Sequence, residues 1–124
     1  MCLQLTLFGI IPRIAFKDIK CYKVVSKTEY ANGLIVYRTP FVADRINIGD
    51  TYTSKFERRG LTIEKGLHSF KSIKGTSILI GPRKDDHAEI IECVIPKWSI
   101  YYKGKFWSRI SYASNKLTYL KLVK

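Results

Sequence analysis

Short runs that read as strands, separated by turn-forming residues, recur along this chain and constrain its fold more than any other feature. Residues 3–7 read Leu-Gln-Leu-Thr-Leu, an alternation typical of a strand with one buried face. The other expected strands are at 20–26, 34–37, 51–53, 61–63, 87–95, 99–102, 106–112 and 117–123. Ser69 or Ser72 could cap one short helix over about 70–79. These runs predict a chain dominated by short strands.

Turn signals divide the strands from one another. Asn32-Gly33 is a strong hairpin signal, and Asn115-Lys116 is expected at the last turn. Arg58-Arg59-Gly60 is interpreted as a basic turn. We expect an α+β, β-rich fold: a single compact domain over 1–124, with a strongly bent antiparallel or mixed sheet, open or barrel-like, and one or two short helices.

Composition supports one soluble domain. The chain has 124 residues, of which 46% are hydrophobic, enough for a core. No run reaches the length of about 18 apolar residues that a membrane span needs. The first residues lack the basic segment of a signal peptide. Three cysteines without zinc spacing indicate reduced thiols, so we expect no metal and a cytoplasmic protein.

Positive charge is concentrated in the C-terminal third. The formal net charge is +12, yet no acidic residue follows Glu92. That third is also rich in aromatic residues, and basic groups interleaved with aromatics suit a phosphate backbone and stacked bases. An acidic protein that imitates nucleic acid is excluded, whereas nucleic acids, nucleotides and acidic protein faces remain open as partners.

Strand alternation sharpens this prediction. If 105–111 is one strand, Lys105, Trp107 and Arg109 share an exposed face opposite the better core face. Lys97 and Lys103 would extend that face into a ligand-binding surface. A purely structural interpretation is also open, because strand aromatics usually pack and strand lysines often only protect edges.

Catalytic signatures are absent from the sequence. His68 lies in the run Gly66-Leu67-His68-Ser69-Phe70, where a turn histidine could bind a phosphate or ribose, or act as a general base. A buried structural histidine is the alternative. There is no P-loop, dinucleotide fingerprint or metalloprotease motif, so we expect no cofactor and assign no catalytic residue.

Four stretches resemble a pattern found in small uncharacterised accessory proteins of bacteriophages and of mobile elements of gut bacteria. The stretches are 21–24, Gly66-Leu67-His68-Ser69-Phe70, residues 92–97 with Tyr101-Tyr102-Lys103-Gly104, and 112–117. The resemblance implies an accessory protein in the cytoplasm of a bacterial host, and it transfers no functional residue. The Gly-Leu-His run also resembles a turn in ADP-ribosyltransferase-like folds.

Four functions therefore stay open, one of them a purely structural role as a virion or replication accessory. The first is a non-enzymatic protein that binds an anionic ligand, either a nucleotide such as a cyclic defence signal or single-stranded nucleic acid, and so counters host defence. The second is an inhibitor that docks its basic face on a host defence protein. The third is an ADP-ribosyltransferase-like enzyme that uses His68. Short edge strands and exposed aromatics are also compatible with a homodimer.

Overall fold

A computed structural model describes residues 3–5, 11–38, 45–74, 76, 88–106 and 109–123. Its strands are β1 (Leu3–Leu5), β2 (Arg13–Ile14), β3 (Ile19–Glu29), β4 (Ile35–Arg38), β5 (Arg45–Ile46), β6 (Thr51–Thr53), β7 (Glu57–Arg59), β8 (Thr62–Lys65), β9 (Leu67–Phe70), β10 (Ala88–Ile95), β11 (Ile100–Phe106), β12 (Arg109–Ser114) and β13 (Lys116–Leu122). The β-rich prediction is confirmed. Within the described part of the chain, no helix is long and apolar enough to cross a membrane.

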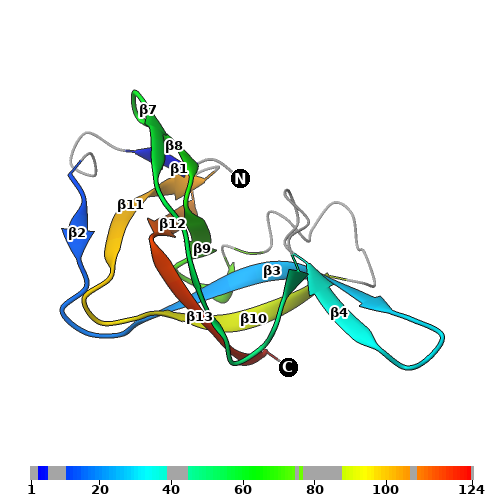
Figure 1. Cartoon of the computed structure of the whole chain (residues 1–124). Helices are drawn as coiled ribbons and strands as arrows, with labels where there is room; N and C mark the ends of the chain where they lie inside the picture. Colours follow the sequence, from blue (N-terminus) through cyan, green and yellow to red (C-terminus); the bar gives the residue numbers. More distant parts are fainter. Residues whose placement is uncertain are drawn as a thin grey trace.

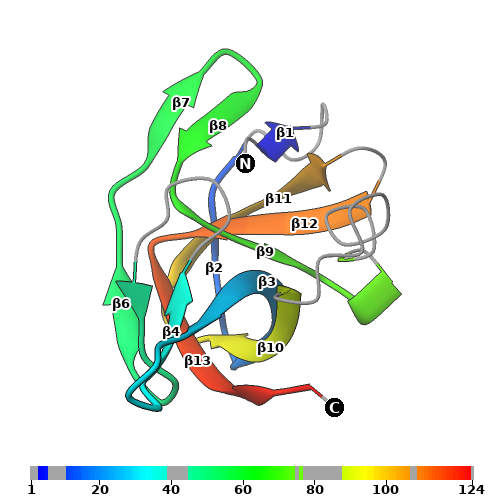
Figure 2. The same ribbon diagram turned by 90° about the vertical axis from the view of Figure 1, so that its right-hand side faces the viewer.

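The strands form one large, strongly curved antiparallel sheet (Figures 1 and 2). Its order is β6-β13-β10-β3-β9-β12-β11-β1-β8-β7, with β2 on β11, β4 on β3, and β5 on β4. The path runs between two different end strands, β6 and β7, so the described strands do not close into a barrel. Of the two forms expected from the sequence, the open bent sheet is the one observed.

The main core lies on the face of the sheet that carries Tyr112, which we call the Tyr112 face. Cys21 of β3 faces Cys93 of β10, which faces Tyr119 of β13, and all three side chains are buried. Leu117 and Tyr112 join the same cluster. Because successive side chains of a strand point to opposite faces, an apolar residue at every second position of each strand is enough to fill this core.

A second, smaller core lies on the opposite face, which we call the Ala113 face. Ile63 and Ala113 are fully buried there, with Phe56 and Tyr102 packed against them. The rings of Phe56 and Tyr102 meet edge to face, 5.1 Å between centroids. Gly66 lies against Phe56, and a β-carbon on it would lie 3.2 Å from the Phe56 ring, so a larger residue there would have to displace this ring slightly.

The sequence placed several turns correctly. Asn32-Gly33 does connect β3 to β4, with Gly33 at a φ of 86° and the Tyr30 N–H donating to the Leu34 carbonyl at 2.8 Å. The expected strand at 51–53 is β6, and β10 is central, between β3 and β13. The last turn lies at Asn115, between β12 and β13.

Three local predictions were wrong. The strand expected over 106–112 is divided, because β11 ends at Phe106 and β12 begins at Arg109, with these two residues paired. Arg58 and Arg59 lie in strand β7 rather than in a turn. The run Leu67–Phe70 is strand β9, not a turn leading into a helix; of the helix expected over 70–79, the described part is helical only at 73, 74 and 76.

Candidate functional site

Four neighbouring strands of the sheet contain no acidic residue. They are β9, β12, β11 and β1, which lie side by side (Figure 2). Basic side chains on them meet no carboxylate within the group of strands. These four strands include the β11–β12 hairpin but not β13, which is separated from β9 by β10 and β3. The candidate basic region is therefore smaller than the C-terminal third of the chain.

Three lysines in this region form a row on the Tyr112 face, and we call Lys71, Lys103 and Lys105 the lysine ledge. Lys103 pairs with Tyr112, and Lys105 pairs with Ile110. The Lys71 N–H donates to the Ile110 carbonyl at 3.1 Å, so β-pairing places Lys71 on the other side of Ile110. Strand geometry separates neighbouring α-carbons of the ledge by roughly 7 to 10 Å.

The lysine ledge is accessible and electrostatically uncompensated. Lys71 and Lys105 are exposed and Lys103 is half-buried. Both ion pairs found among the described residues involve Glu92, on β10, so none involves the ledge. An anion of matching size could therefore approach these three ammonium groups without displacing an acidic partner.

The remaining predicted site residues do not gather around the ledge. Arg109 pairs with Phe106 and lies on the Ala113 face, so the prediction that Lys105 and Arg109 share one face was wrong. The reason is the chain reversal between β11 and β12, which resets the alternation. Trp107 lies outside the described residues. Lys97 lies in the connection between β10 and β11.

His68 is inside the protein rather than in an exposed turn. Only 7% of its surface is exposed, and neither ring nitrogen has a hydrogen-bond partner among the described residues. Burial, assisted by the positive charge of Lys23, lowers the pKa of His68 to about 3. Lys23 itself donates to the His68 carbonyl at 2.8 Å. His68 is thus a neutral interior group, out of reach of a surface ligand.

The buried cysteines are chemically quiet. Cys21 and Cys93 face one another on β3 and β10 and are free thiols. Burial raises the pKa of Cys21 to about 11, and burial with the neighbouring Cys21 raises the pKa of Cys93 further. Thiols with raised pKa are poor nucleophiles. Among the described residues, no three His, Cys, Asp or Glu side chains are grouped to hold a metal ion.

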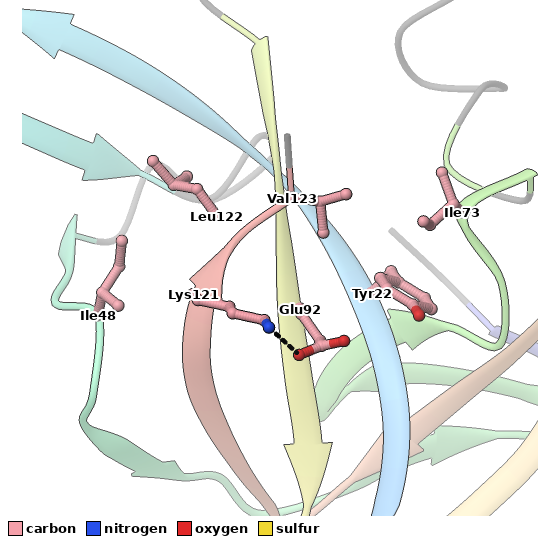
Figure 3. A pocket seen from close by; sticks show the side chains of 7 residues that line it. All are labelled: Tyr22, Ile48, Ile73, Glu92, Lys121, Leu122 and Val123. Atoms are coloured by element: carbon pink, nitrogen blue, oxygen red, sulfur yellow. Dashed lines mark ion pairs between the residues drawn. The ribbon is translucent and has the colours of Figure 1, made fainter.

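A groove of about 680 Å³ lies beside β10 on the Ala113 face (Figure 3). Its walls include Tyr22, Ile73 and Val123, and its charged residues are Glu92 and Lys121. The Glu92 carboxylate already binds two ammonium groups, Lys20 Nζ at 3.4 Å and Lys121 Nζ at 3.8 Å. Because the two lysines are already paired with Glu92 and the other walls are mostly aliphatic, this groove is a weaker candidate for an anion site than the lysine ledge.

A second surface lies where the chain turns from β10 into β11, and we call Ile14, Phe16, Lys97, Trp98 and Ile100 the aromatic corner. Trp98 is 65% exposed and Phe16 is 76% exposed, and their rings meet edge to face with 6.2 Å between centroids. Lys97 Nζ lies 5.1 Å from the centroid of the Trp98 ring. Sequence reasoning selected Lys97 but missed both rings.

The backbone of the aromatic corner is fixed and strained. Trp98 has a φ of 72°, and no other non-glycine among the described residues has a positive φ. Ser99 N donates to the Pro96 carbonyl at 3.0 Å, so Trp98 occupies the turn position that usually needs glycine. Trp98 N donates to the Ala15 carbonyl at 2.6 Å, and Lys97 N donates to Asp18 Oδ1 at 2.8 Å. These bonds hold the strained turn in place.

The variant Trp98→Gly is expected to be more stable than the variant Trp98→Ala, although glycine has the smaller side chain. A left-handed conformation costs a residue with a β-carbon about 1 to 2 kcal/mol, and glycine avoids that cost. Trp98→Ala retains the strain and removes the ring, so it is the matched control. Chemical denaturation should give Trp98→Gly a free energy of unfolding about 1 kcal/mol above that of Trp98→Ala. An equal or lower value would contradict the strained turn.

Comparison of the chain with protein-family models, with curated proteins and with solved structures finds no match.

Proposed function

We propose that this protein is a non-enzymatic binding protein that takes an anionic ligand, a nucleotide or single-stranded nucleic acid, on the lysine ledge. The supporting observation is the coincidence of the three ledge lysines with four neighbouring strands that contain no carboxylate. Lysines at this spacing suit a ligand that carries more than one phosphate group. The resemblance to bacteriophage accessory proteins makes a host nucleotide signal or a nucleic-acid strand the first class to test.

The geometry gives the enzymatic alternative less support. An ADP-ribosyltransferase-like reaction through His68 requires that the imidazole reach a substrate, and the ring is buried. The low pKa of His68 leaves a weakly basic ring that ordinary pH does not protonate. Binding without catalysis needs neither property.

The direct test is the salt dependence of binding. A labelled oligonucleotide of about 16 nucleotides should bind the full chain, with affinity falling steeply as salt rises. Each phosphate contact contributes roughly 0.7 to the log–log slope for single strands. Replacing Lys103 and Lys105 together by glutamine should therefore lower the slope by roughly 1.4 and weaken binding at every salt concentration. Fluorescence anisotropy provides both quantities.

Lys27→Gln is the control for each lysine taken singly, because it removes one positive charge from the β3–β4 hairpin, which projects away from β11 (Figure 1). It should leave the slope unchanged. A nucleotide ligand would instead appear as thermal stabilisation by one member of a panel of mono-, di- and cyclic nucleotides, lost in the double variant. If neither probe binds, or if Lys27→Gln weakens binding as much as the double variant, the proposal is wrong.

A further inference from the structure

The aromatic corner exposes a group of neighbouring large apolar side chains that the fold does not bury. Ile14 and Ile100 pair across β2 and β11 and are 51% and 39% exposed. Phe16 and Trp98, exposed still more, contact one another beside them. Contiguous exposed apolar side chains with a polar rim are typical of a surface that another molecule covers. Tryptophan is also among the residues that carry most of the energy in protein interfaces.

The corner is prepared in advance for binding. The strained Trp98 turn is held by hydrogen bonds to Ala15 and Asp18. Strained backbone conformations persist where surrounding structure over-determines them, and they gather at functional sites. A backbone that is already held in its bound conformation loses less conformational freedom when a partner covers it.

An open strand edge lies along the same surface. Ala15 N donates to the Ser99 carbonyl, and the Ala15 carbonyl accepts from Trp98 N, so the polar groups of Ala15 point toward β11. Because antiparallel pairing alternates, the N–H and carbonyl of Ile14 point to the other side. Among the described strands, β2 pairs with β11 alone. An extended segment could bond to Ile14 while its side chains contact the corner.

The charged side chains around the aromatic corner indicate which kind of partner it can bind. Arg13, Lys17 and Lys97 are exposed around the apolar side chains. The nearby acid, Asp18, is engaged with the Lys97 N–H. A second copy of the chain would bring two sets of these cations together across a twofold interface, which opposes self-association. The exposed aliphatic side chains of Ile14 and Ile100 favour a protein over a nucleic acid, because bases would stack on Phe16 and Trp98 and leave the two isoleucines uncovered.

We propose that the aromatic corner is a docking surface for an acidic, apolar polypeptide segment of another protein. The segment presents apolar side chains to Phe16 and Trp98, and carboxylates to Arg13, Lys17 and Lys97. This interaction is separate from the anion binding proposed for the lysine ledge, because the two surfaces share no residue.

The test is an unbiased selection of linear peptides from a random displayed library against the full chain. Enriched peptides should combine acidic residues with apolar or aromatic ones. Their affinity, measured with synthetic peptides, should fall at least tenfold for the variant Phe16→Ala with Trp98→Ala, and should weaken for Lys17→Glu. Leu34→Ala is the control, because Leu34 is an exposed apolar residue at 47% in the β3–β4 turn. Thermal unfolding of each variant shows that the fold is retained.

Five outcomes would overturn the proposal. The selection yields no enriched peptide, the enriched peptides lack acidic residues, or they bind the double variant as tightly as the original chain. The fourth is sedimentation of the original chain as a dimer that Trp98→Ala converts to a monomer, which assigns the corner to a second copy. The fifth is loss of oligonucleotide binding in the variant Phe16→Ala with Trp98→Ala, while the lysine ledge variants still bind. That result would assign the aromatic corner to nucleic acid, and it would overturn both the docking proposal and the proposal for the lysine ledge.

Discussion

Replacing Phe70 by alanine is expected to lower the free energy of unfolding by about 3 to 5 kcal/mol. Phe70 is 1% exposed, and its ring meets that of Phe106 edge to face with 6.0 Å between centroids. It also occupies the position at which β9 pairs with Tyr22 of β3. A cavity there removes packing from the point that joins the β3–β10 half of the sheet to the β11–β12 half. Urea denaturation measures the loss.

Phe16→Ala is the matched control for this prediction. The chemistry of the substitution is identical, but the Phe16 ring is 76% exposed and leaves no cavity when it is removed. Its free energy of unfolding should change by no more than about 0.5 kcal/mol. Comparable losses in the two variants would show that burial does not determine how much these two rings contribute to the free energy of unfolding.

The stability of the protein should fall as the pH drops from about 6.5 toward 3, because of His68. The pKa of His68 is lowered from 6.5 to about 3 in the folded chain. Below pH 6.5 the unfolded histidine takes up a proton that the folded one refuses, so protons favour the unfolded state. The free energy of unfolding should decrease by about 1.4 kcal/mol per pH unit from this group. The effect reaches a few kcal/mol near pH 4.

His68→Leu isolates this contribution, since it removes the titrating ring and two buried nitrogens that have no hydrogen-bond partner in the described part of the chain. The general effect of net positive charge at low pH acts on both proteins and cancels in their difference. The two stabilities should therefore diverge steadily below pH 6.5, with the leucine variant less sensitive to acid. Parallel curves between pH 6.5 and 4 would contradict the burial of a neutral histidine.

The sequence predicted strands well where the residue pattern is regular and turns well where they need glycine. Tyr22 and Val24 do share a face of β3, and Gly33 does form its hairpin. The prediction failed at the β11–β12 hairpin. The expected gap after residue 102 is crossed by a strand that runs through buried Gly104, which pairs with Ser111. A glycine inside a strand cannot be distinguished from a turn glycine in the sequence.

The candidate site was predicted only in part, for related reasons. Lys103 and Lys105 could be chosen from charge and alternation, but Lys71 joins them through pairing between strands distant in the sequence. Phe16 and Trp98 were missed because an exposed aromatic looks identical to a buried one in a sequence. A Pro-Lys-Trp-Ser turn without glycine is the one local signal that could have pointed to Trp98.

The pairing of β3 with β10 determines how late during synthesis the centre of the sheet can form. Its eight residue pairs run from Ala88 with Ser26 to Ile95 with Ile19, partners separated by about half the chain. Such non-local ladders form slowly compared with hairpins. On the ribosome, β3 can pair at once with β4, but its other edge must wait until β10 has emerged. During that interval Cys21 and Val25 are uncovered, so the nascent chain passes through an aggregation-prone stage that the finished sheet conceals.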